Sequence, residues 1–191
     1  MKKRKIFIKL CYVLIIAMIA VFAISCYSGN QNNKAIIGQM LVNIYDNQHF
    51  ALVRVQKNLE NRNNMMLMYQ SDQLGNLVNY NFAVGDTKQP GHLLYEGLFK
   101  EISIVCDENR TEQEREEARI SAIAFAKQLI EIREKVDEFC TNELRWYQLG
   151  PPGYDKLYRQ KLLNYYKLLD RHNKLYQKIE AYIYDYYLYP D

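Results

Sequence analysis

The residues best placed for a chemical step are the four that end at Cys26, Ala23-Ile24-Ser25-Cys26. They close an unbroken apolar run, Leu10 to Ile24, and Ser25 is a small residue of the kind that precedes a lipid-modified cysteine in a bacterial lipobox. In this interpretation a signal peptidase cuts before Cys26, and the cysteine then carries a lipid. The sequence therefore makes Cys26 a candidate lipidation site.

Two other interpretations of the same segment stay open. Leu10–Tyr27, as a helix rising 1.5 Å per residue, is about 27 Å long, which is enough for an uncleaved membrane span. Alternatively, an ordinary secretory signal is removed and nothing tethers the product. The basic residues before the run predict an N-terminus in the cytoplasm. A lipid anchor and an uncleaved span would both place the domain on the far side of a bacterial membrane, in the cell envelope.

The net charge of +3 belongs to this leading segment rather than to the domain. Five of the 25 basic residues precede the apolar run, and no acidic residue does. Beyond Cys26 the chain has 20 basic against 22 acidic residues, a net charge of −2. The domain thus has no excess of positive charge that would favour nucleic acid as a partner.

Catalytic and metal-binding patterns are missing from the sequence. His49, His92 and His172 stand far apart, and none belongs to a helical metal-ligand spacing. There is no Gly-x-Ser-x-Gly, no phosphate-binding loop and no Cys-x-x-Cys. We therefore expect a non-enzymatic protein with no cofactor, and we expect His172 to be a hydrogen-bonded core residue.

Cys106 and Cys140 invite a disulfide prediction that geometry opposes. In a helix over 112–147, Cys140 lies about 42 Å from the helix start. The five residues that join Cys106 to that start extend at most about 20 Å. A disulfide needs Cα atoms within about 7 Å, so we expect two unpaired, largely buried thiols.

Two long helices are predicted in the C-terminal half, over 112–147 and 154–188. Thr111 and Glu114 form a capping box before the first helix, and Gly150-Pro151-Pro152-Gly153 separates the two. If the chain folds back antiparallel about this turn, residues whose numbers sum to 301 lie opposite each other. The apolar stripes of the two helices then align, with Val136 facing Tyr165 and Ala122 facing Ile179. We expect an all-α fold, an antiparallel bundle of three or four helices dominated by this hairpin.

The first half is less regular. A helix is predicted to begin near Ile37 and to bend at Asn61-Arg62-Asn63-Asn64, and a shorter one is predicted over 94–105. Between them, residues 71–91 read as an irregular loop. The expected organisation is an anchor or signal over 1–26, a polar tether over 27–35 and a helical extracytoplasmic domain over 36–191.

Two segments are candidate interaction surfaces. Inside the 71–91 loop, Val78, Tyr80 and Phe82 alternate with polar residues, which is typical of a strand that could pair with a partner's strand. At the C-terminus, 11 of the 17 tyrosines fall within residues 147–191. Clustered tyrosines favour protein contacts, and the candidates in this surface are Tyr182, Tyr186 and Tyr187.

Residues 4–60 resemble the start of a chemoreceptor-type four-helix-bundle sensor. The resemblance rests on the basic lead Arg4-Lys5-Ile6 with Lys9-Leu10, on one span, and on a helix that carries Ile44-Tyr45-Asp46-Asn47-Gln48. It implies a periplasmic helical bundle that senses small molecules or binding proteins. The sequence ends at Asp191 without the second span and signalling domain of that family.

Together these features predict a non-enzymatic, membrane-tethered envelope protein, a bacterial lipoprotein if Cys26 is modified. Its expected partners are the membrane and another envelope protein or the cell wall. The alternative function is a sensor-like ligand-binding bundle held by an uncleaved span.

Overall fold

The computed structural model describes residues 2–80, 90–141 and 153–188, and within these ranges it contains helices and no strand. The expectation of an all-α fold is confirmed. The elements are α1 (Lys2–Glu60), α2 (Asn64–Tyr80), α3 (His92–Cys106), α4 (Glu112–Thr141), α5 (Gly153–Lys167), α6 (Lys174–Ile183) and a short π-helix η3 (Tyr184–Leu188).

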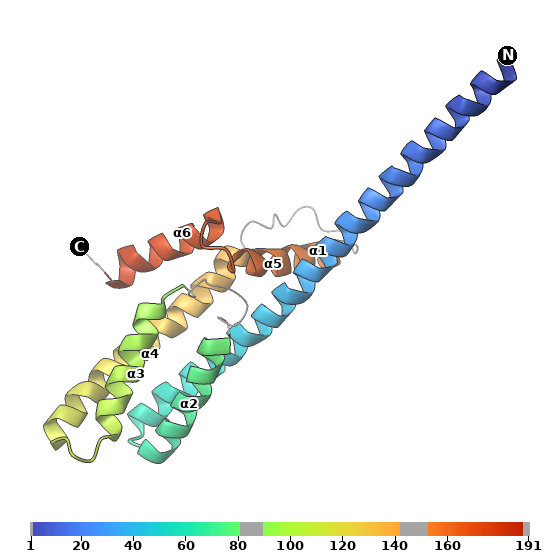
Figure 1. The fold of residues 1–191 in the computed structure, drawn as a ribbon. Coiled ribbons are helices and arrows are strands. Elements are labelled where there is room, and N and C mark those ends of the chain that lie inside the picture. The colour runs from blue at the N-terminus through green and yellow to red at the C-terminus, as the bar shows by residue number, and fades with distance from the viewer. Residues whose placement is uncertain (1, 81–89, 142–152, 189–191) are drawn as a thin grey trace.

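Helix α1 is much longer than the sequence analysis expected, and the segment 27–35 lies inside it. Its N-terminal part projects from the body of the molecule, and its C-terminal part contacts α2, α4 and α5 (Figure 1). The buried side chains of this part recur at alternating steps of four and three, as one helix face requires. Those on this face are Leu41, Tyr45, Gln48, Leu52, Val55 and Leu59, and Val42 and Ala51 are buried beside them.

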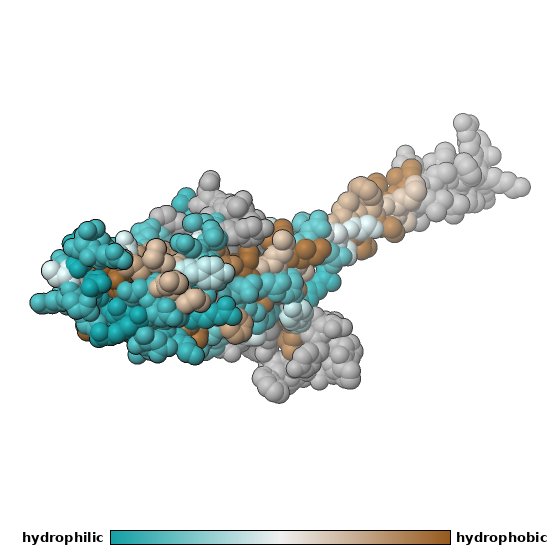
Figure 2. Space-filling view, turned by 90° about the horizontal axis from the view of Figure 1, so that it is seen from below, coloured by the Kyte–Doolittle hydropathy of each residue, from teal (hydrophilic) through white to brown (hydrophobic). Residues whose placement is uncertain are grey.

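The projecting part of α1 carries exposed apolar side chains, among them Ile15, Ile19 and Phe22. In Figure 2 the part of the projection next to the body is largely brown, hence hydrophobic, while the face of the body seen there is mostly hydrophilic. Among the residues that the structure describes, no helix is both long enough and apolar enough to cross a membrane.

The predicted break after α1 is confirmed. Arg62 adopts a positive φ of 56°, and α2 begins at Asn64 with the Asn63 side chain accepting a hydrogen bond from the Met66 backbone N–H at 3.2 Å. The irregular loop expected over 71–91 is wrong for residues 71–80, which belong to α2. The alternation of apolar and polar residues around Val78 also fits a helix that buries one of them, and Val78 is buried in the core.

Helix α4 begins as the sequence predicts. Thr111 Oγ1 accepts from the Glu114 backbone N–H at 3.2 Å, and a Glu114 carboxylate oxygen accepts from the Thr111 backbone N–H at 2.8 Å. This reciprocal pair is the predicted capping box. Helix α3 packs closely on α4: a Cβ added to Gly97 would lie 2.7 Å from the Phe125 ring. The predicted end of α4, near residue 147, lies outside the described residues.

The prediction of a long hairpin over 112–147 and 154–188 is wrong in two respects. Helix α4 packs mainly on α3 and α1, and α5 packs mainly on α1. The second helix also does not continue to 188, because turns over 168–173 separate α5 from α6. Asp170 accepts the His172 backbone N–H and Asn173 caps α6, so these polar side chains stop the helix.

The register is kept near the end of α5 and lost beyond the turn. Tyr165 donates to Asp137, one residue from its predicted partner Val136. Ile183 instead lies beside Gly91 and Ile132, far from the predicted Ala118. His172, expected in the core, is exposed in the turn.

The close approach of α1 to α5 at Gly38 yields a prediction about stability. A Cβ on Gly38 would lie 1.9 Å from the Leu162 backbone oxygen, whereas one on Gly75 would meet only the Phe99 ring at 3.9 Å. We expect Gly38→Ala to lower the free energy of unfolding by about 1–3 kcal/mol through overpacking. The control Gly75→Ala should raise it by up to about 1 kcal/mol. Chemical unfolding of the full chain in detergent measures both, and equal effects of the two variants would contradict the packing.

Candidate functional site

The structure places the predicted site residues in separate regions. Cys26 is an exposed residue of the N-terminal half of α1, and none of the other candidates lies on this helix. Cys106 is half-buried at the end of α3, Cys140 is buried on α4, and no disulfide joins the two. The geometric argument against that disulfide is thereby confirmed.

The first predicted surface does not form as expected. Val78 is a buried helical residue, and Tyr80 is the last residue of α2. Phe82 lies outside the described residues. The prediction of a strand is therefore wrong at Val78 and Tyr80, since helical hydrogen bonding continues through both.

The second predicted surface is a packed aromatic cluster at the end of the chain. The Tyr182 ring lies 4.6 Å from the Tyr186 ring and 5.8 Å from the Phe139 ring of α4. The Tyr187 hydroxyl donates to Glu131 at 3.1 Å. Tyr186 remains 66% exposed, so it is the member of this cluster that is most available to a partner.

A site that the sequence analysis missed surrounds Arg133. This arginine of α4 is only 4% exposed, and its guanidinium carbon lies 4.2 Å from the Tyr45 ring centroid and 5.7 Å from that of Tyr95. None of its guanidinium nitrogens makes a well-formed hydrogen bond within the described residues, and the Tyr45 and Tyr95 hydroxyls are the polar groups that interact with it. A buried cation in this state retains unused donors, which is costly unless another group meets them.

Arg133 borders a cavity of about 270 Å³ between α1, α4 and α5. Tyr45 and Tyr165 both line it, with their rings in a T-shaped contact at 5.5 Å. The rim is acidic, because Asp46 and Glu134 are exposed and Asp137 accepts from Tyr165 at 2.7 Å. Lys161 pairs with the same Asp137 oxygen at 2.6 Å. The cavity thus combines one buried cation, Arg133, with carboxylates at its opening.

Burial dominates the ionisation behaviour of this site. It raises the pKa of the Tyr45 and Tyr95 hydroxyls, and the Arg133 charge opposes that rise. Burial also raises the pKa of Tyr165, and the Asp137 carboxylate adds to the effect. The tyrosines therefore stay neutral hydrogen-bond donors at physiological pH, while Arg133 stays a cation.

Arg119, on the same helix, is a buried arginine whose two terminal guanidinium nitrogens do have hydrogen-bond partners. It lies 14 residues, two heptads, before Arg133 and is equally buried. Its guanidinium donates to the Leu59 carbonyl at 3.2 Å and to Asn64 at 3.4 Å, and it pairs with Glu116 at 3.3 Å. Both arginines border the predicted apolar stripe, which is the signal from which the sequence could have placed them inward.

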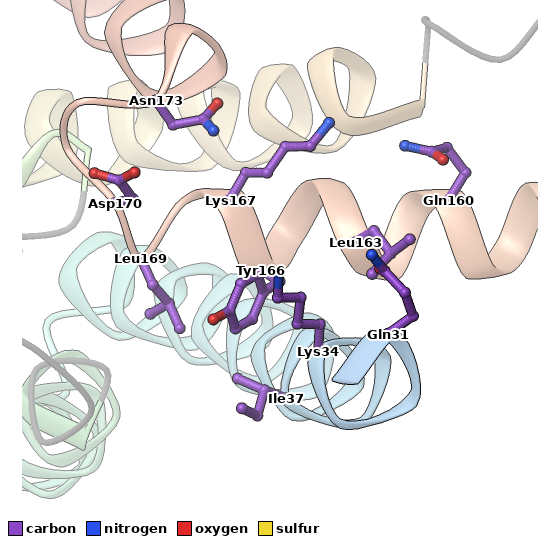
Figure 3. Close-up of a pocket in the computed structure, with 10 residues that line it drawn as sticks. All are labelled: Gln31, Lys34, Ile37, Gln160, Leu163, Tyr166, Lys167, Leu169, Asp170 and Asn173. Carbon is purple, nitrogen blue, oxygen red and sulfur yellow. The ribbon is translucent and has the colours of Figure 1, made fainter. Parts of the chain in front are cut away.

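A second cavity lies between α1 and α5 (Figure 3). It has a volume of about 650 Å³, and Lys34 and Lys167 are the basic residues that line it, with Asp170 opposite in charge. Lys34 lies over the Tyr166 ring at 5.6 Å, and Lys167 donates to Asn164 at 2.8 Å. Because both lysines already have neighbours, this cavity has a weaker claim to a ligand than the Arg133 site.

Metal binding finds no support in the described parts of the chain, where no three His, Cys, Asp or Glu side chains gather closely enough to hold an ion. No protein-family model matches the sequence, and no curated protein and no solved structure is significantly similar to it. The functional argument therefore depends on the geometry alone.

The two arginines give a matched prediction. Arg133→Met should raise the free energy of unfolding by about 1–3 kcal/mol, because it removes a buried charge without well-formed hydrogen bonds and keeps a long side chain between the tyrosine rings. Arg119→Met should lower it by about 1–3 kcal/mol, because the Leu59 carbonyl loses its donor.

Chemical unfolding of the two variants beside the wild type checks both signs. Destabilisation by Arg133→Met as large as that by Arg119→Met would show that Arg133 is a structural residue with satisfied contacts.

Proposed function

We propose that this chain is a non-enzymatic, membrane-anchored protein of a bacterial cell envelope, whose helical domain binds another envelope protein. The observation that carries the proposal is the projecting part of α1, which exposes large apolar side chains on every side of the helix. Exposed apolar surface of this extent marks contact with a membrane or a protein. The five basic residues before it support a cytoplasmic N-terminus.

The anchor takes one of two forms. The unbroken course of α1 through Cys26 supports an uncleaved span that continues directly into the domain. The lipobox spacing supports cleavage before Cys26 and a lipid on its thiol. Either form places an antiparallel bundle, built on α1 to α4, outside the cytoplasm.

The mass of the mature chain distinguishes the two forms. For the span, we expect full-length chain in the membrane fraction, with no lipid label lost on Cys26→Ser substitution. For the lipoprotein, residues 1–25 should be missing and lipid labelling should disappear in Cys26→Ser. Recovery of the wild-type chain outside the membrane fraction would refute both anchors and with them the proposal.

The partner-binding part of the proposal rests on Tyr186. Its exposed ring packs on Tyr182, whose ring packs on Phe139, so it forms an aromatic surface at the end of α6, apart from the projecting part of α1 (Figure 1). Aromatic anchors of this type are enriched at protein interfaces.

A photo-reactive residue at Tyr186 should therefore trap one dominant envelope protein in cells. The matched control is a photo-reactive residue at Tyr158 of α5, a half-exposed tyrosine outside the cluster. Equal products from the two positions, or none from Tyr186, would count against a docking surface there.

The Arg133 cavity favours a second candidate function, a sensor-like bundle that binds a small solute. A carboxylate could meet the guanidinium donors of Arg133, and an ammonium group could meet the acidic rim. A solute with both groups should then raise the melting temperature of the wild type, and Arg133→Met should abolish that rise. A panel of such solutes that shifts neither protein, or both equally, would remove this candidate.

A further inference from the structure

One face of α1 is left uncovered along almost its whole length. Exposed residues recur along it at alternating steps of four and three, starting in the projecting part and continuing beside the domain. We call this face the outer stripe. Its members are Ile15, Ile19, Phe22, Cys26, Gly29, Asn33, Ile36, Met40, Asn43, Asn47 and Phe50.

The outer stripe is distinct from the core-forming face of the same helix. The buried residues Leu41, Tyr45 and Leu52 lie on the opposite side of α1, at other positions of the seven-residue repeat. Helix α5 borders the stripe, since Tyr158 donates to Gln39 and Arg159 to Asn32. Even so, Ile36 is 61% exposed and Met40 is 52% exposed.

We infer that the outer stripe is the contact surface of a parallel homodimer, in which α1 of one copy packs against α1 of a second copy. Six of the eleven members of the stripe are large apolar residues, and they stand at the seven-residue spacing by which two parallel helices pack as a coiled coil: Ile15, Ile19, Phe22, Ile36, Met40 and Phe50. The parallel orientation rests on the membrane anchor proposed above, which would hold both copies at the same height and in the same direction.

The polar members of the stripe fit a second copy better than a different partner. In a parallel pair each residue of the stripe faces its own equivalent, so Asn43 meets Asn43 and Asn47 meets Asn47. A carboxamide has both a donor and an acceptor and can therefore pair with a second one. Asparagine at such positions also fixes the register of two helices.

The size and charge of the outer stripe agree with a second copy of the chain as its partner. In the uncleaved form of the anchor, the stripe from Ile15 to Phe50 is about 52 Å long, and at about 10 Å wide it buries about 500 Å² on each copy. The total of about 1,000 Å² reaches the range of specific interfaces. Charges are absent from the stripe up to Phe50, and Arg54 and Lys57, which follow in phase, would place like charges together and so end it.

Disulfide trapping tests the dimer in membranes. In full-length chain carrying Cys11→Ala and Cys26→Ser, we would compare Ile36→Cys with Ile120→Cys, an isoleucine of α4 that is 63% exposed. Facing residues of a coiled coil lie within disulfide reach. A copper–phenanthroline oxidant should convert Ile36→Cys into a covalent dimer of twice the chain mass and leave Ile120→Cys and the background variant monomeric.

Equal cross-linking at the two positions, or none at Ile36→Cys, would overturn the dimer. Because Cys26→Ser removes the candidate lipid site, the membrane fraction of the same samples reports separately on the uncleaved span: chain that is membrane-bound but not cross-linked refutes the dimer and leaves the span standing.

A second measurement does not depend on cysteine chemistry. The mass of the detergent-solubilised wild type should be twice 22.7 kDa after subtraction of detergent. It should fall twofold in the double variant Ile36→Glu, Met40→Glu and stay unchanged in Ile120→Glu. Since all three positions are exposed, these changes leave the core intact. A wild type with the mass of one chain would overturn the inference.

Discussion

The inner face of α1 receives a specific contact from each part of the domain that surrounds it. At Gly38 the backbone of α5 comes so close that no side chain fits between the helices. At Tyr45, Arg133 of α4 lies over one ring face and Tyr165 of α5 meets the ring edge-on. At its last turn, the Leu59 carbonyl accepts from Arg119. A cation at a helix C-terminus is favourable, so this contact fixes where α1 ends as well as what it packs on.

Because only one face of α1 makes these contacts, the rest of the helix remains available for contacts outside the domain. The projecting part carries apolar residues on all sides, and the part beside the domain carries the outer stripe. The same helix thus connects the proposed membrane anchor, the Arg133 cavity and the inferred dimer surface. A movement of α1 along its axis would shift Tyr45 relative to Arg133, which gives the sensor candidate a physical route from cavity to membrane.

Local signals in the sequence predicted several elements well. The Thr111–Glu114 capping box, the break at Asn61-Arg62-Asn63-Asn64 and the helix around 94–105 depend on residues within a few positions, and all three form. The long hairpin failed because its register was extrapolated through the turn at Asp170 and Asn173, whose side chains bond to nearby backbone and end the helix. The Arg133 site was missed because it needs Tyr45, Tyr95 and Arg133 from three helices, and no local pattern relates them. Val78 was misread because a short alternating run does not separate a strand from a half-buried helix.

The central proposal, for the uncleaved form of the anchor, is that α1 passes from the bilayer into the domain as one helix. Spin labels at Phe22 and Phe50 test it most directly, since both residues lie on the outer stripe and are 72% and 63% exposed. In full-length protein in lipid vesicles, we predict that the label at position 22 relaxes with membrane-dissolved oxygen and the label at position 50 with an aqueous nickel complex. Equal access of the nickel complex to both positions, or removal of position 22 from the mature chain, would contradict the claim.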